Sequence, residues 1–214
     1  MNRILKKSIW LAIFISILIW SAIEPKDYVL WFLQMIPVIV GISVMLLTYK
    51  RFPLTPLLYF LILFYSIIIM IGSHYSYTEV PLFDTIKPFF GFERNNYDKV
   101  GHVFQGFVPA IIAREIFIRK EIIYSSKWMN FIIVCICLAL SALYELIESI
   151  AAVFSGKPAE VSLGTQGYSW DTQTDMALAL FGAIIALTLL GRLHDKQLAN
   201  LVATNGGWMN NYKK

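Results

Sequence analysis

The chain has 214 residues, of which 57% are hydrophobic and 15% are charged, and its mean hydropathy is +0.63. A soluble domain of this length normally contains about 25% charged residues, so the composition excludes an ordinary soluble domain. The formal net charge of +4 follows from Lys and Arg concentrated in alternate loops. We therefore expect no nucleic-acid partner.

The apolar residues occur in blocks long enough to cross a bilayer, which takes about 20 residues as a helix. We predict an all-α fold, a polytopic transmembrane helical bundle with about six spans. The first span follows a basic start and resembles a signal peptide, but no small-x-small cleavage site follows it, so we expect a retained helix. The predicted spans are residues 8–23, 28–49, 54–72, 100–118, 128–154 and 172–191.

We interpret residues 1–214 as a single integral membrane domain with two halves. The first three spans, about 8–72, are almost entirely apolar and form a supporting half. The last three, about 98–191, carry the polar residues and form the functional half, followed by a polar cytoplasmic tail, 192–214. The long loop 73–99 is rich in aromatic residues and proline, which favours a position on the membrane surface or a dip into the protein.

Orientation follows from the distribution of Lys and Arg. Twelve of these residues lie in the N-terminus, the tail and the two loops on the same side, and five lie in the other three loops. Because cytoplasmic loops are enriched in Lys and Arg, we predict that both termini are cytoplasmic. The expected location is the bacterial plasma (inner) membrane, with multiple passes.

The fourth span opens with the polar stretch YDKVGHVFQGF, residues 97–107. Asp98, His102 and Gln105 are four and then three residues apart, which places them on one helical face. In the predicted orientation Asp98 lies at the outer rim, and His102 lies about 6 Å deeper.

Two more helices carry acidic residues in the same outer half of the membrane. The fifth span ends with SALYELIESIAAVF, in which Glu145 and Glu148 are one turn apart, and Glu148 lies about 9 Å below the outer end. The sixth span begins with Asp171 at its mouth and Asp175 one turn in. An acid at mid-helix costs about 2.5–3.5 kcal/mol on insertion scales, so such residues usually face the bundle interior and find partners.

These residues together predict a cation site. Two carboxylates one turn apart repel each other unless one is protonated or a cation lies between them. An imidazole with several carboxylates suits Zn²⁺, Mn²⁺, Mg²⁺ or Ca²⁺. The candidate metal ligands are His102, Asp98, Glu145, Asp175 and Asp171, and the candidate catalytic residues are Glu148 and Glu145.

Simpler interpretations stay open for several of these residues. Asp98 and Asp171 both stand at a helix start, where they can act as N-caps alone. His102 can simply hydrogen-bond a backbone carbonyl or a carboxylate. Arg114 and Glu115, near the inner face, are interpreted as orientation anchors, and His194 as a loop residue with no partner pattern.

A glycine-rich polar segment, LGTQGYSWDTQTDM (residues 163–176), leads into the sixth span. It is either a helix-capping turn or part of a binding site for a headgroup or sugar. In the second case the candidate substrate-binding residues are Gln105, Thr165, Gln166, Trp170 and Gln173.

Three motifs, YDKVGHVFQGFVPAIIARE, ALSALYELIE and LGTQGYSWDTQTDM, resemble the YjdF-like family of bacterial inner-membrane proteins in order and spacing. The resemblance covers most of the chain and implies architecture and location but no activity. The DKVGH portion is also similar to the D-K-x-x-H stretch of VanZ-like proteins, over one helix only, and no mechanism is transferred from it.

Three function classes remain. The first is a metal-dependent hydrolase or transferase acting on a lipid or lipid-linked headgroup. The second is a cation- or proton-coupled transporter. The third is a non-catalytic membrane factor that binds a lipid or a partner protein. The chain contains no P-loop or dinucleotide fingerprint, so no nucleotide is expected.

Overall fold

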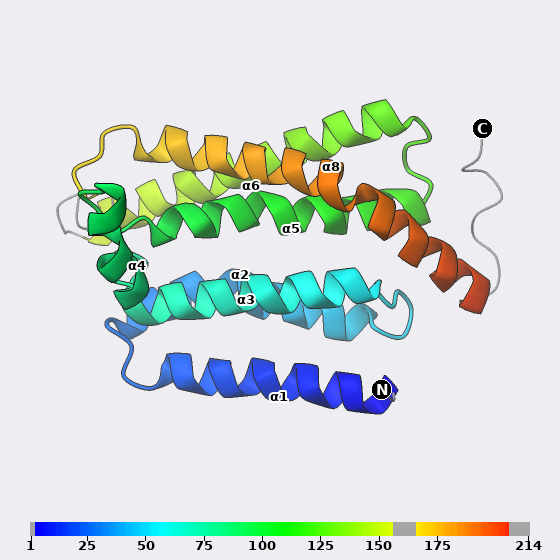
Figure 1. Ribbon diagram of the computed structural model, residues 1–214, viewed down its shortest axis with the longest axis horizontal. Coiled ribbons are helices and arrows are strands. Elements are labelled where there is room, and N and C mark those ends of the chain that lie inside the picture. The colour runs from blue at the N-terminus through cyan, green and yellow to red at the C-terminus, as the bar shows by residue number, and fades with distance from the viewer. Residues whose placement is uncertain (1–2, 156–165, 206–214) are drawn as a thin grey trace. The chain divides into compact units, whose positions relative to one another are not determined.

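The computed structural model describes residues 3–155 and 166–205, and every regular element within them is helical (Figure 1). The predicted all-α polytopic fold is confirmed. A helix satisfies all its backbone groups internally, which the hydrocarbon interior of a membrane requires. The elements are α1 (Arg3–Ala22), α2 (Tyr28–Thr48), α3 (Pro56–Tyr75), α4 (Pro81–Ile86), the 3₁₀ helix η1 (Lys87–Phe90), α5 (Tyr97–Arg119), α6 (Ser126–Ser155) and α8 (Asp171–Asn205).

Five of the described helices, α1, α2, α3, α6 and α8, are long and apolar enough to cross a membrane. The fourth expected span is α5, which is continuous over 23 residues but is not among these five. Its sequence is less apolar and includes the charged residues Asp98, Lys99, Arg114, Glu115 and Arg119. The span that carries the opening polar motif is therefore also the most polar of the six.

The chain divides into two compact units, and each is described by itself. The first comprises residues 1–53 and 62–101. Its core lies between α1, α2 and α3, and the side chains at its centre are Phe14, Met35, Val38, Leu63, Ile69 and Met70. Asp27 caps α2, because one of its carboxylate oxygens accepts hydrogen bonds from the backbone N–H groups of Val29 and Leu30.

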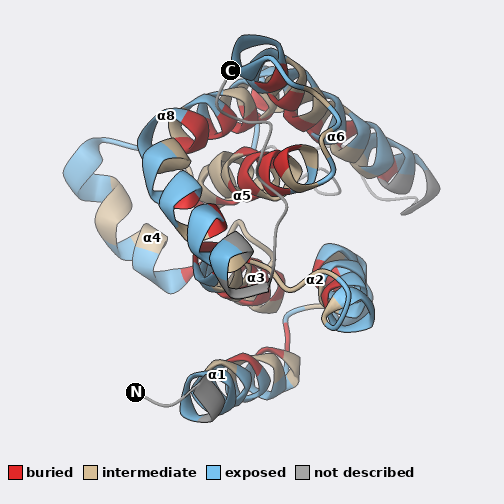
Figure 2. Ribbon diagram, turned by 90° about the vertical axis from the view of Figure 1, so that its right-hand side faces the viewer, coloured by how far each residue is buried: buried red, intermediate tan, exposed pale blue. Residues whose placement is uncertain are grey.

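The second unit comprises residues 54–61 and 102–214 and holds most of α5, together with α6 and α8. Within α5 only Ile116 is exposed, and the other residues are buried or intermediate. Figure 2 shows buried residues along α5 and exposed outer faces on α6 and α8. The polar residues of α5 that belong to this unit, from His102 onward, are therefore buried or half-buried.

Two glycines bring α5 and α8 into backbone contact. A Cβ added at Gly106 would overlap the carbonyl group of Ala179, and one added at Gly182 would overlap the carbonyl oxygen of Val103. Small residues permit this close approach between membrane helices. The crossing lies one turn from His102 on α5 and two turns from Asp175 on α8, so it sets the distance between those side chains.

The last helix is longer than the expected sixth span. α8 continues to Asn205, past the predicted end of the span at residue 191, and His194 lies within it. His194 is fully buried. The expectation that it is a loop residue without partners is therefore wrong. The remaining tail residues lie outside the described part of the chain.

The predicted orientation is testable by cysteine labelling in cells, after Cys135 and Cys137 are replaced with alanine. A cysteine at Glu93 should react with a membrane-impermeant maleimide in intact cells. A cysteine at Lys50 or Lys120 should react only after permeabilisation, because both positions lie in loops that are predicted to face the cytoplasm. All three positions are exposed. The reverse labelling pattern would invert the orientation.

Candidate metal centre

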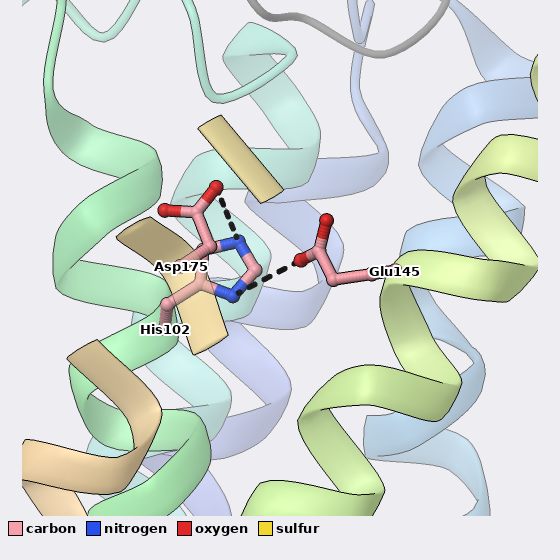
Figure 3. Close-up of side chains that lie close together, drawn as sticks. All are labelled: His102, Glu145 and Asp175. Atoms are coloured by element: carbon pink, nitrogen blue, oxygen red, sulfur yellow. Dashed lines mark ion pairs between the residues drawn. The ribbon is translucent and has the colours of Figure 1, made fainter. Parts of the chain in front are cut away.

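Three helices of the second unit each contribute one ionisable side chain to a compact cluster, which we call the outer cluster: His102 of α5, Glu145 of α6 and Asp175 of α8 (Figure 3). His102 Nδ1 lies 3.8 Å from Glu145 Oε1, and His102 Nε2 lies 3.7 Å from Asp175 Oδ2. The imidazole thus stands between two carboxylates that come from different helices. Each side chain is at most 12% exposed.

A neighbouring amide orients the imidazole. His102 Nδ1 is 2.8 Å from Oε1 of Gln105, one turn along α5. The Gln105 carbonyl oxygen is an acceptor, so Nδ1 carries the proton and donates, and Nε2 presents its lone pair toward Asp175. The ring of Tyr144 packs edge-on against the imidazole, with the centroids 6.2 Å apart. His102 is therefore held in one tautomer and one orientation.

Two buried oxygens beside the imidazole are left without hydrogen bonds. Among the described residues, neither Glu145 Oε1 nor Ser141 Oγ has a hydrogen-bond partner, although Glu145 is 6% and Ser141 0% exposed. Ser141 lies one turn before Glu145 on α6. An unsatisfied buried polar group costs about 1–3 kcal/mol, and more if it is charged. Such groups call for an explanation by a ligand, an ion or water.

Two further acids lie close to the cluster. Glu148 is close enough to Glu145, Asp175 and Asp171 for their negative charges to act on it, and Asp171 acts in the same way on Glu145. Asp171 is buried at the first turn of α8. The region therefore concentrates four carboxylates around one imidazole, and mutual repulsion among them favours a bound cation.

The comparison with known proteins assigns the family. The family described as predicted membrane protein (DUF2238) matches residues 6–196. The chain belongs to this family. It is 46% identical over 182 residues to the inner membrane protein YjdF of Escherichia coli (strain K12). The aligned region covers 85% of this chain and 87% of that protein. No solved structure matches the chain.

These matches confirm the predicted resemblance and the location. The chain is an integral, multi-pass protein of the bacterial inner membrane. Membership of the family carries no activity with it, so the chemistry has to be argued from the side chains of this member.

The remaining predicted site residues are not members of the three-residue cluster, and one of them is not described. Asp98, on the first turn of α5, belongs to the first compact unit, where its carboxylate pairs with Arg94. Trp170 and Gln173 are exposed around the start of α8. Gln166 is exposed as well and has a positive φ of 49°. Thr165 lies outside the described residues.

A second polar cluster, which we call the inner cluster, was not predicted from the sequence. Its centre is Glu115 of α5, which is 0% exposed. One carboxylate oxygen accepts hydrogen bonds from Thr55 Oγ1 at 2.7 Å and from His194 Nε2 at 3.0 Å. The other accepts one from Arg119 Nη1 at 2.8 Å, and the backbone N–H of Thr55 lies 3.2 Å from it.

The hydrogen bonds of the inner cluster fix the state of His194. Arg114 Nη1 lies 3.1 Å from His194 Nδ1, and because a guanidinium only donates, Nδ1 is the acceptor and Nε2 carries the proton. Arg114 also pairs with Asp195 at 2.7 Å. The cluster joins α5 and α8 to the start of α3. The charges of Arg114, Glu115 and Arg119 on α5 were its signal in the sequence. The other partners, Thr55, His194 and Asp195, are 60–81 residues away.

Proposed function

We propose that the outer cluster binds a divalent cation, and that the protein is a metal-dependent hydrolase or transferase acting on a lipid or lipid-linked headgroup at the outer membrane face. The observation that carries this proposal is the position of His102 between Glu145 and Asp175, beside buried oxygens that lack hydrogen bonds. The lipid bilayer is the medium from which the substrate comes.

The spacing of the donor atoms supports a metal ion. Two atoms each bound at about 2.1 Å to a zinc ion lie about 3.4 Å apart in a tetrahedral site. The 3.7 Å between His102 Nε2 and Asp175 Oδ2 is close to that value. One donor atom from each of the three residues lies within 4.8 Å of the others, so each residue offers one ligand atom to a three-ligand site.

The donor set favours some cations over others. A nitrogen ligand with two carboxylates suits Zn²⁺ and Mn²⁺ better than Ca²⁺, which takes six to eight oxygen ligands. The hydrogen bond from His102 Nδ1 to Gln105 is the arrangement usual for metal-binding histidines, in which the second ring nitrogen donates to an acceptor that fixes the tautomer. We therefore rank Zn²⁺ and Mn²⁺ above Mg²⁺ and Ca²⁺.

Glu148, which is not one of the three ligands, has a role in this chemistry. A bound cation would polarise a carbonyl or phosphoryl oxygen of the headgroup, and Glu148 would take a proton from the attacking water or hydroxyl group. The oxygen of that nucleophile would bond to the carbon or phosphorus atom as the ester bond breaks, and Glu148 would return the proton to the departing oxygen. Trp170 and Gln173, exposed at the start of α8, are candidates for contact with the headgroup.

Transport across the bundle is less well supported. Between the outer and inner clusters, the buried residues of α5 and α8 are apolar or small: Val108, Ala110, Ile111, Ala179, Ala183 and Ala186, each at most 1% exposed. This packed layer separates the two polar regions along the helices. A transported ion would find no polar side chain among these residues.

Metal binding is tested by metal content and thermal melting of the purified protein. After chelator treatment, adding Zn²⁺ or Mn²⁺ should restore about one ion per chain and raise the melting midpoint by several degrees, since a ligand at 100 times its dissociation constant stabilises by about 2.7 kcal/mol. The rise should vanish in His102→Ala, Glu145→Gln and Asp175→Asn. The exposed Glu79→Gln is the control and should respond like wild type.

The reaction is tested separately with the metal-loaded protein in liposomes of bacterial lipid extract, followed by mass spectrometry. Wild type should convert a lipid or lipid-linked headgroup, whereas Glu148→Gln should keep the ion and lose the product. A wild type that binds no ion and melts unchanged refutes the metal site. A bound ion without any product would instead favour the non-catalytic lipid- or protein-binding alternative.

A further inference from the structure

The segment that joins α3 to α5 in the first compact unit has a rigid base. Asn95, 1% exposed, donates from Nδ2 to the carbonyl oxygen of Val80 at 3.0 Å, and its Oδ1 accepts from the N–H of Tyr97 at 3.2 Å. The hydroxyl group of Tyr97 donates to the carbonyl oxygen of Ile68 on α3 at 3.0 Å. These bonds bring the two ends of the segment together and attach them to α3.

Aromatic rings fill the space above this base. The ring of Phe83 on α4 packs edge-on against Tyr97, with the centroids 5.2 Å apart, and that of Tyr77 lies 5.9 Å from Tyr97. A Cβ added at Gly72 would overlap the Tyr77 ring, and one at Gly101 would approach it to 3.2 Å. Tyr77 therefore occupies a notch between two glycines, which further restricts movement of the base.

The far end of the segment is apolar and uncovered. We call Leu82, Phe89, Phe90 and Phe92 the aromatic tip; they are 65%, 84%, 68% and 49% exposed. The rings of Phe90 and Phe92 stack, with the centroids 5.7 Å apart and the planes 17° apart. Gly91 lies between them at φ 66°, a conformation that glycine adopts at little cost, and this turn brings the rings together.

The basic residues near the aromatic tip are paired with acids. Lys87 lies 3.2 Å from Asp84, and Arg94 pairs with Asp98. The exposed Glu93 beside Phe92 adds one negative charge, so the tip has no excess positive charge with which to select anionic headgroups. Its chain position also limits its distance from the bilayer: Pro81 is six residues after the end of α3, and Phe92 is five residues before the start of α5.

We propose that the aromatic tip inserts into the boundary between the headgroups and acyl chains of the bilayer and serves as a fixed interfacial anchor. Exposed apolar patches of this kind mark interaction sites, and Phe and Leu are typical of apolar surfaces that bury at the boundary between headgroups and acyl chains. The partner is the lipid surface itself, recognised through apolar contact rather than headgroup charge. This inference is independent of the metal site.

Spin-label accessibility tests the anchor. The chain, with Cys135 and Cys137 replaced by alanine, carries a nitroxide at position 82, 89 or 90, or at the control position 79, whose glutamate is exposed and polar. Each protein is reconstituted in nanodiscs of phosphatidylcholine alone or with phosphatidylglycerol. Labels on the tip should collide more often with oxygen than with a water-soluble nickel chelate, and the control label should show the opposite preference.

Three outcomes would overturn the anchor. Tip labels as accessible to the nickel chelate as the control would place the tip in water. Tip labels protected from both reagents would indicate cover by a protein or a second copy of the chain. Insertion that requires phosphatidylglycerol would indicate electrostatic binding. Because the substituted side chains are exposed, each labelled protein should keep the melting midpoint of its unlabelled parent.

Discussion

Replacing Gly106 or Gly182 with alanine is expected to destabilise the protein by about 3 kcal/mol or more. Overpacking a core usually costs about 1–3 kcal/mol. At both positions the added Cβ would overlap a backbone carbonyl group of the facing helix, and backbone cannot move aside as a flexible side chain does. The helices α5 and α8 would have to separate. The measurement is thermal melting in detergent.

The matched control is Gly191→Ala, on the same helix as Gly182. A Cβ at Gly191 meets nothing within 4 Å, and alanine is favoured over glycine in a helix by about 1 kcal/mol. Its melting midpoint should be unchanged or higher than that of wild type. Equal melting of Gly106→Ala, Gly182→Ala and wild type would show that α5 and α8 do not cross in backbone contact.

Removing the carboxylate of Glu115 is the second change with a large expected effect. Glu115→Ala leaves Arg119, His194 and Thr55 without the acceptor at the centre of the inner cluster. Removing one partner of a buried ion pair costs about 3–5 kcal/mol, because the other charge stays buried and uncompensated. We expect a marked loss of thermal stability and of purified yield.

The control for Glu115 lies at the exposed edge of the same cluster. Asp195→Asn keeps an oxygen acceptor for Arg114 and changes a side chain that is 59% exposed. An exposed pair contributes at most about 1 kcal/mol, so this variant should melt close to wild type. If Glu115→Ala also melts like wild type, the inner cluster does not hold α5, α8 and the start of α3 together.

The helix contacts at Gly106 and Gly182 show how much of the packing can be predicted from the sequence. Small residues at helical spacing in the sixth span are typical of helix-packing positions, but nothing local identifies Gly106 as the partner of Ala179 or Gly182 as the partner of Val103. Each contact joins residues more than 70 positions apart in the chain. Helical periodicity gives the face of each helix, and only the packed structure gives the facing residue.

The cost of burying charge explains why the residues of the outer cluster stood out in the sequence. His102, Glu145 and Asp175 stood out because ionisable residues are costly inside an apolar helix and need partners there. That reasoning selected them from three separate helices, and the structure brings the three together. It also selected Asp98, which pairs with Arg94 in the first compact unit, and the role of Asp98 as a metal ligand stays a prediction.

The inner cluster marks the limit of the same reasoning. Arg114 and Glu115 were treated as residues at the membrane edge, where a long charged side chain can reach water. The helix α8 continues past the expected end of its span and carries His194 to Glu115, so the carboxylate is fully buried instead. Helix ends are poorly determined by sequence when polar residues continue the helix beyond the apolar block.

By itself the sequence determined the class of the molecule, its helices, its place in the inner membrane and the acidic residues of the outer cluster. These depend on local quantities, namely the length of apolar blocks and the cost of a charge inside them. Only the tertiary structure decided that Gln105 orients His102, that Glu145 and Ser141 keep unpaired oxygens, and that Glu115 sits in a closed network. These depend on distances between helices, which helical periodicity does not contain.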